Sequence, residues 1–297
     1  MKIYNFGSLN IDYVYEVDTI VKVGETISSF SYEKLIGGKG LNQSIALAKA
    51  QAQVIHLGCV GEDGLYLLDY MKGFGVQVDH VQVVDVPTGH AIIQLDSLGN
   101  NSIVLYPGAN HHVSKSYIDE MFKFITSDDL ILLQNEISNL EYIVDQAYEL
   151  GIPVALNLAP VTPNALALDF SKITHLLINE TEGEALTAET DYLLIGSKLV
   201  KTYPNLGVVL TLGEKGSIYF HGDQVITQKI FQTEAVDTTA AGDTFTGFYL
   251  TTWYETTNVR QALEVASCAS SLAIEQKGAA NSIPARSLVM ARLNEHR

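Results

Sequence analysis

Short, continuous apolar segments recur along the chain of 297 residues, and this pattern restricts its possible folds more than any other feature. The apolar segments are residues 3–6, 54–60, 130–133, 153–158, 175–178 and 208–212. Segments with helical periodicity lie between them, at residues 40–50, 62–74, 139–150 and 191–203. Buried strands that alternate with helices are typical of a doubly wound α/β fold, with helices on both faces of a mostly parallel sheet.

Two segments depart from this alternation, residues 13–35 and 88–106. Both are rich in β-branched and aromatic residues, contain glycine turns and alternate in polarity, as half-exposed antiparallel strands do. We expect them to form a small second sheet that acts as a lid over a site at one edge of the core, although ordinary surface hairpins would have the same pattern. A third hairpin, residues 217–230, is expected at an edge of the main sheet. No repeat or linker divides the chain, so we predict a single domain over residues 1–297.

The charge and the cysteine content argue against several classes of protein. Lys and Arg total 18 against 34 Asp and Glu, a net charge of −16, which disfavours nucleic acid or an anionic membrane surface as a partner. Cys59 and Cys268 are too few for a disulfide framework or a zinc site, and we expect buried thiols in a reducing compartment. The sequence shows no signal-peptide core and no apolar run of the roughly 18 residues that a membrane-spanning helix needs. A cytoplasmic protein is therefore expected.

The segment DTTAAGDTFTG places an acidic residue, Asp243, at the start of a predicted helix. Ala240, Ala241 and Gly242 come directly before it. In one interpretation Asp243 caps the helix by accepting hydrogen bonds from free amides. In the other, the small residues leave their amides open as an anion-binding site, and the carboxylate beside them acts as a base. The second arrangement suits phosphoryl transfer, in which charge on the moving group is stabilised and the attacking hydroxyl loses a proton.

A glycine-rich segment, LIGGKGLNQS, precedes another predicted helix. Its glycines, Gly38 among them, allow the backbone to approach a ligand closely, and Lys39 and Asn42 can donate hydrogen bonds. The segment lacks the spacing of a Walker A loop, and the dinucleotide pattern G-x-G-x-x-G is also absent. A plain turn between a strand and a helix remains an alternative for this segment on its own.

Polar side chains follow two of the predicted strands. Asn10 and Asp12 lie in GSLNID after the first strand, and Glu136 lies in NEIS after a later one. Ligands of open α/β sheets bind at the carboxyl ends of the strands. Amide and carboxylate groups at that edge suit the vicinal hydroxyls of a sugar, although polar loop residues are also common there.

Two further segments suit a nucleotide site. Asn179 and Glu182, in INETEGE, lie at a predicted strand-to-helix junction. Their spacing fits a capping box, and it also fits a water-mediated Mg²⁺ site, because Mg²⁺ binds few carboxylates and keeps several waters. Gly213 and Gly216, in TLGEKGS, would shape the floor of a nucleotide pocket.

Taken in order, these segments resemble the ribokinase family of ATP-dependent carbohydrate kinases. The matching segments are GSLNID, GGKGLNQ, PGAN, NEIS, NLAP, INETEGE, TLGEKG, VDTTAAGDTFTG and QKGAANS. They cover nearly the whole chain, and such an ordered series is far more specific than one glycine-rich loop. The resemblance implies a central α/β domain with a small β-sheet lid and, as in many members, a homodimer in which the two lids pack together.

The resemblance also implies roles for individual residues. Asp243 is the expected catalytic base, beside an anion hole formed by the amides around Ala240, Ala241 and Gly242. The sugar-binding positions match Asn10, Asp12, Gly38, Lys39, Asn42 and Glu136. The nucleotide positions match Asn179, Thr211, Gly213, Gly216 and Ser267, with Glu182 in an Asn-x-x-Glu motif associated with Mg²⁺ and phosphate. A monovalent cation site, usually occupied by K⁺, falls on Asp237, Thr239, Ala273, Gln276, Gly278 and Ser282.

The cation site also makes physical sense. An ion held by backbone carbonyls near Asp237 and Gly278 would stabilise the anion-hole loop and add positive potential. In the alternative interpretation, Asp237 caps a turn and Gly278 ends a helix that runs from about residue 259 to residue 276.

The expected reaction is transfer of the γ-phosphoryl group of MgATP to the primary hydroxyl of a pentose, with the 5-hydroxyl of D-ribose as the first choice. Leu41, where the family commonly has Ala, and His90 in the lid would alter the sugar preference. A family kinase for another sugar or a nucleoside, and a noncatalytic sugar or nucleotide sensor, remain alternatives. A dinucleotide-dependent oxidoreductase is remote because its fingerprint is absent.

Overall fold

The computed structural model describes residues 2–296, and its main element is an eight-stranded sheet. Its strands are β1 (Ile3–Phe6), β4 (Val54–Leu57), β9 (Leu130–Gln134), β10 (Val154–Asn157), β11 (His175–Asn179), β12 (Gly207–Thr211), β13 (Ser217–His221) and β14 (Gln224–Gln228). They are arranged in the order β14-β13-β12-β11-β10-β9-β1-β4. All neighbours from β4 to β12 are parallel, and β13 and β14 form an antiparallel hairpin at one edge. The predicted doubly wound, mostly parallel sheet is confirmed.

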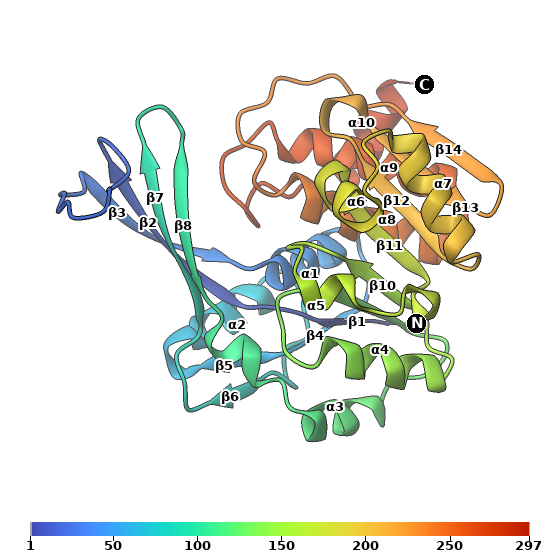
Figure 1. Ribbon diagram of the computed structural model, residues 1–297, viewed down its shortest axis with the longest axis horizontal. Helices are drawn as coiled ribbons and strands as arrows, with labels where there is room; N and C mark the ends of the chain where they lie inside the picture. Colours follow the sequence, from blue (N-terminus) through green and yellow to red (C-terminus); the bar gives the residue numbers. More distant parts are fainter. Residues whose placement is uncertain (1, 297) are drawn as a thin grey trace.

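Helices cover both faces of this sheet (Figure 1). They are α1 (Lys39–Lys49), α2 (Leu65–Lys72), α3 (Lys115–Phe122), α4 (Leu140–Glu149), α5 (Pro163–Leu166), α6 (Glu180–Thr187), α7 (Tyr192–Thr202), α8 (Ala241–Thr256), α9 (Val259–Ala273) and α10 (Arg286–Glu295). Successive strand residues enter opposite cores: Ile131 packs in the core that contains residues of α3, α4 and α7, and Leu132 in the core that contains residues of α1, α8 and α9. Within residues 2–296, no helix is long and apolar enough to cross a membrane.

A separate four-stranded sheet projects from the main body on the side where β1 ends (Figure 1). Its order is β3 (Ser31–Gly37), β2 (Asn10–Val17), β7 (Gly89–Asp96) and β8 (Asn101–Tyr106). The pairs β2–β3 and β7–β8 are antiparallel as predicted, but the central pair β2–β7 is parallel. Both central strands leave the core in the same direction, starting from Asn10 opposite Gly89, so an all-antiparallel sheet was the wrong prediction.

Three other features of the fold differ from the predictions. The apolar run at residues 54–60 is two strands, because the chain bends at Gly58, and β5 (Cys59–Gly61) pairs with β6 (Gln82–Val84) in a sheet of its own. A Cβ atom at Gly58 would lie 2.6 Å from the carbonyl oxygen of Gly7, so this close approach requires glycine. Helix α9 ends at residue 273 rather than 276, and helices α3, α5 and α10 were not predicted.

Candidate active site

A cavity of about 640 Å³ lies where the carboxyl ends of the central strands meet the small sheet. Asn157, Asn179 and Thr211 end β10, β11 and β12, and all three line it. The small sheet contributes apolar side chains to the opposite wall, Ala91 and Leu105 among them. The predicted site residues that line this cavity are Asn10, Asp12, Gly38, Lys39, Asn42, Glu136, Asn179, Glu182, Thr211, Thr239, Gly242 and Asp243.

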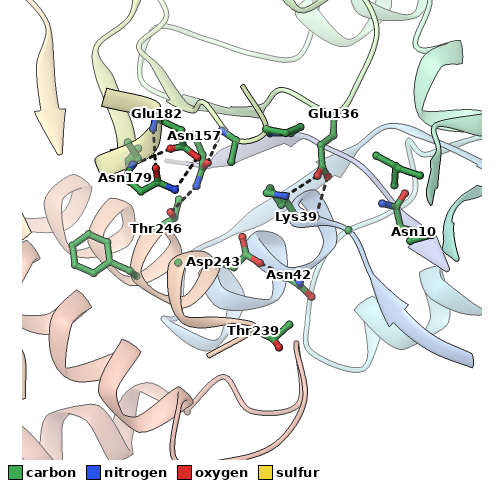
Figure 2. A pocket seen from close by; sticks show the side chains of 18 of the residues that line it. Asn10, Lys39, Asn42, Glu136, Asn157, Asn179, Glu182, Thr239, Asp243 and Thr246 are labelled. Carbon is green, nitrogen blue, oxygen red and sulfur yellow. Dashed lines mark hydrogen bonds and ion pairs between the residues drawn. The ribbon is translucent and has the colours of Figure 1, made fainter. Parts of the chain in front are cut away.

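Asp243 lies in the first turn of α8 and borders this cavity, with 9% of its surface exposed. Its carboxylate accepts hydrogen bonds from Asn42 Nδ2 at 3.1 Å and from Gln43 Nε2 at 2.9 Å, both on α1 (Figure 2 shows Asp243 and Asn42). Burial raises the pKa of Asp243 to about 6, and the hydrogen bonds from Gln43 and Asn42 and the charge of Lys39 oppose that rise. The N-cap of α8 is Ala240, without any side-chain cap. The capping interpretation of Asp243 is therefore wrong, and its carboxylate is ionised at neutral pH.

The amides at the start of α8 are only partly free. The Ala241 N–H donates to the Thr238 carbonyl at 3.1 Å, which closes a turn. Within the described part of the chain, the N–H groups of Gly242 and Asp243 have no acceptor. A Cβ atom on Gly242 would meet nothing within 4 Å, so the backbone there faces open space. Two free amides at a helix N-terminus form a site for an anion directly beside the Asp243 carboxylate.

The opposite end of the cavity carries an ion pair. Lys39 Nζ lies 2.9 Å from Glu136 Oε1, and Glu136 also accepts hydrogen bonds from the Lys39 amide and the Ser8 hydroxyl. Burial acts to lower the pKa of Lys39. The charge of Glu136 and the hydrogen bond between the two side chains outweigh burial, so the pKa is raised. Burial, followed by the nearby Glu136 charge, raises the pKa of Asp12 to about 6. The cavity therefore offers two carboxylates and an ammonium group of fixed position to polar groups of a ligand.

Three local features hold this end in shape. Asn10 Oδ1 accepts from Asn110 Nδ2 at 2.7 Å, which fixes the Asn10 side chain through its oxygen and leaves both of its own amide hydrogens for a ligand. Gly38 is the N-cap of α1 with φ of 97°, a left-handed conformation that favours glycine. A Cβ atom at Gly40 would lie 2.2 Å from the amide nitrogen of Ser8, so the loop after β1 and the start of α1 approach each other closely only because glycine is present.

A second cavity, of about 550 Å³, adjoins the first at the start of α8. Both cavities are lined by Thr211, Gly242 and Phe245, so they adjoin at these residues, next to Asp243 in the wall of the first. The second is bordered by the predicted nucleotide residues Gly213, Gly216 and Ser267, and by apolar side chains such as Phe231 and Ile274. Apolar walls with a few polar groups suit a planar heterocycle, and the free amides at the junction suit its phosphates.

A family model described as "pfkB family carbohydrate kinase" matches residues 2–286 of this sequence. The chain belongs to the pfkB family of carbohydrate kinases. Ribokinase of Haemophilus influenzae is 35% identical to it over 289 residues, covering 94% of each chain. Ribokinase of Bacillus subtilis is 34% identical over 289 residues, covering 95% of this chain and 96% of its own. The structure of Arabidopsis thaliana ribokinase with ribose and ATP matches with a TM-score of 0.87 and 33% identity, covering 98% of both chains.

Asn179 and Glu182 form the capping box of α6 in this pfkB kinase. The backbone N–H of each residue donates to the side-chain oxygen of the other, at 2.9 Å in both cases. Burial raises the pKa of Glu182, whereas the Asn179 amide and the Lys39 charge oppose the rise. Because both side chains also line the first cavity, the capping box fixes a carboxylate in the cavity wall.

Among the predicted cation residues, Thr239 lines the first cavity. The other five line neither cavity. Asp237 accepts from the Thr239 amide and the Gly278 amide, each at 2.9 Å, and so ties the segment before α8 to the segment after α9. Burial acts to raise the pKa of Asp237, but the hydrogen bonds from the Thr239 hydroxyl and from these two amides outweigh it, so the pKa is lowered. Asp237 thus caps a turn, as in the alternative interpretation, but Gly278 lies beyond the end of α9 and does not terminate it. Gln276 is exposed, whereas Ala273 and Ser282 are buried.

Gln43 is the main site residue that sequence reasoning missed. It lies in the glycine-rich segment GGKGLNQ, in which only its neighbour Asn42 and Lys39 were predicted to donate hydrogen bonds to a ligand. Gln43 is fully buried and contacts Asp243, which is 200 residues away in the sequence. Asn110, in the quoted PGAN, was likewise given no role. Both act through other site residues, and no local pattern marks such contacts.

Proposed function

We propose that this chain is a ribokinase, which transfers the γ-phosphoryl group of ATP to the 5-hydroxyl of D-ribose. The observation that carries the proposal is the position of Asp243, an ionised carboxylate beside two free helix amides at the junction of two cavities. The curated relatives named ribokinase, and the ribokinase structure solved with ribose and ATP, support this assignment.

In this proposal the first cavity binds the sugar. Asp12 and Glu136 accept hydrogen bonds from ribose hydroxyls, while Asn10 and Lys39 donate to them. Asn42 joins them, and Gly38 lets the ligand approach the backbone. These contacts hold the primary hydroxyl toward Asp243, which removes its proton as the phosphoryl group is transferred.

The second cavity binds ATP in this proposal. Thr211, Gly213, Gly216 and Ser267 surround the nucleoside, and its terminal phosphates lie at the amides of Gly242 and Asp243, next to Ala240 and Ala241. Mg²⁺ bound to the phosphates would neutralise charge that develops during transfer. Glu182 and Asn179 fit a water-mediated contact with that ion, because Glu182 is a buried carboxylate that lines the cavity.

A K⁺ site is proposed at Asp237, Thr239, Ala273, Gln276, Gly278 and Ser282. The ionised Asp237 carboxylate and the carbonyl groups of these two segments are the oxygen donors that such a cation requires. Because Asp237 and Thr239 precede α8 directly, an ion bound there would hold the amides of Gly242 and Asp243 in place.

We also propose that the small sheet is a lid and the dimer contact of a cytoplasmic enzyme. Cross-strand partners place Asp12, Ala91 and Leu105 on the cavity face, so the alternate residues Ile92 and Val104 lie on the other face. Ile92 and Val104 are 42% and 64% exposed. An apolar face of this kind favours a second copy of the chain as a cover.

A substrate panel tests the proposal. ADP release would be measured with D-ribose, 2-deoxy-D-ribose, D-fructose and adenosine, each with and without K⁺. The proposal predicts the highest kcat/KM for ribose and a lower rate without K⁺. A higher kcat/KM for adenosine or fructose would assign another member of the family, and absence of sugar-dependent ADP release would support a noncatalytic sensor.

A further inference from the structure

A chain of buried amide side chains extends from Asp243 into the core, on the side away from the cavity. Gln43 Nε2 donates to Asp243 Oδ1 at 2.9 Å, and Gln43 Oε1 accepts from Gln134 Nε2 at 2.7 Å. Gln134 Nε2 also donates to Asn5 Oδ1 at 2.9 Å. Asn5, Gln43 and Gln134 have 0% of their surface exposed. They come from three separate elements, β1, α1 and β9, so only the folded core brings them together.

The groups at both ends of this chain accept hydrogen bonds from it. At one end is the ionised Asp243 carboxylate, and at the other Asn5 Nδ2 donates to the Gly40 carbonyl and to the Ser44 hydroxyl, each at 2.8 Å. An amide between two acceptors must donate in both directions, and Gln134 does so with the two hydrogens of Nε2. Its Oε1 is buried without a partner in the described part of the chain. Gln134 Oε1 is left unpaired because Gln134 presents its Nε2 to both neighbours. By donating to Gln43 Oε1, Gln134 turns the other end of that amide, Nε2, toward Asp243.

We propose that Gln43 and Gln134 are positioning residues for the catalytic base: Gln134 fixes the direction of the Gln43 amide, and Gln43 holds the Asp243 carboxylate ionised and correctly oriented. Asp243 is almost fully buried, and a buried carboxylate without donors would be protonated near neutral pH. Gln43 supplies a donor from the core side, leaving the cavity side of the carboxylate to the substrate hydroxyl. This inference rests on the proposed role of Asp243.

The charged groups around Asp243 do not replace this contact. Lys39 favours the ionised form of Asp243 and Glu136 disfavours it. Asp12 and Glu182 line the same cavity. Among residues 2–296, no hydrogen bond or ion pair connects any of these four to Gln43 or Gln134, so the amide chain acts on the base independently of them.

Two variants of the full-length enzyme test the proposal. Gln43→Met keeps the length of the side chain but removes the donor to Asp243, and Gln134→Met changes a residue that does not contact Asp243. For Gln43→Met we expect the acid limb of the kcat profile to move up by about one pH unit. On the alkaline plateau kcat should fall about tenfold or more, because the base is misoriented, with the KM for ribose within about threefold of the wild-type value. Gln134→Met should give a smaller shift in the same direction.

Tyr117→Phe is the matched control. Tyr117 is also buried, and its hydroxyl donates to the His80 carbonyl at 2.9 Å and accepts from the Gly58 amide, away from the site. This variant should unfold at a lower temperature and keep the wild-type acid limb. The proposal is overturned if folded Gln43→Met has the wild-type limb and plateau, or if Tyr117→Phe shifts the limb equally. If Gln43→Met does not fold, an unshifted limb in Gln134→Met overturns it.

Asp243→Asn, assayed in the same series, separates this inference from the proposed function. If Asp243→Asn keeps wild-type turnover, Asp243 is not the base and both conclusions fail. If Asp243→Asn is inactive while Gln43→Met behaves as wild type, the base is confirmed and only the positioning role is lost.

Discussion

Replacing Asp243 with Asn is expected to lower activity and to change how stability depends on pH. The substitution preserves shape and removes a buried carboxylate that contacts both Asn42 and Gln43. Since general base catalysis contributes about 10²- to 10⁴-fold, kcat should fall by that factor. The KM for ribose should change by less than about threefold, because the sugar contacts are provided by other residues.

The stability effect follows from the pKa of Asp243, which burial raises from 3.8 to about 6. A carboxyl whose pKa is raised on folding stabilises the protein below pH 3.8, and this contribution is lost as the pH rises through 6. At 1.36 kcal/mol per unit, the ionised group costs about 3 kcal/mol at pH 8. The Asn side chain has only one acceptor oxygen, so it loses the hydrogen bond from Asn42 or from Gln43, which costs about 1–3 kcal/mol at any pH. Relative to wild type, Asp243→Asn should therefore gain about 1.5 kcal/mol between pH 5 and pH 8, where the wild-type carboxyl ionises.

Two measurements check this prediction on the same samples. Steady-state ADP release with saturating ATP and ribose gives kcat, and urea unfolding at pH 5 and pH 8 gives the free energy of unfolding. A kcat within about threefold of wild type would refute Asp243 as the base. A difference in the free energy of unfolding between variant and wild type that is the same at pH 5 and pH 8 would refute the assigned cost of its burial.

Four further predictions concern other parts of the site. In the wild-type enzyme kcat/KM should fall about tenfold per pH unit below pH 6 when only Asp243 must be ionised, and up to about a hundredfold when Asp12 must be ionised as well, because the pKa of each is about 6; a flat profile down to pH 5 would contradict the pKa of Asp243. Gly242→Ala should keep the wild-type unfolding temperature, since its methyl group enters open space, but should lower kcat about 10²- to 10³-fold by obstructing the free amides; an active variant would rule out the anion hole. Asp237→Asn should abolish the difference between rates in KCl and choline chloride, and retained K⁺ activation would place the cation elsewhere. Lys39→Met should raise the KM for ribose about tenfold or more by leaving Glu136 without its partner, and an unchanged KM would remove Lys39 from the sugar site.

The periodicity of the chain was sufficient to predict the main sheet and most of the helices that cover it, but not α3, α5 or α10. Strands such as residues 3–6 and 130–133 are buried on both faces, so their apolar runs are unambiguous. The small sheet was predicted from its alternation, but the parallel pairing of β2 with β7 was not, because register between distant strands is set by where they leave the core. The bend at Gly58 depends on contact with Gly7, which local sequence does not encode.

For the site, sequence predicted the residues that follow strands or precede helices, because the fold brings those positions to one edge. Asp243 and Glu136 are of this kind, and both line the cavity. Gln43 and Gln134 were not predicted, since each looks like an ordinary residue of a helix or a strand. Their contacts join elements 91 and 200 residues apart and appear only when the core is assembled.

The most direct test of the central claim is identification of the product formed from ATP and D-ribose by phosphorus and proton nuclear magnetic resonance. Sugar phosphorylation with Asp243 as base predicts one phosphomonoester, coupled to the two protons on C5, and formed at a greatly reduced rate by Asp243→Asn. Phosphate on another hydroxyl, no sugar phosphate at all, or an undiminished rate in Asp243→Asn would contradict the account.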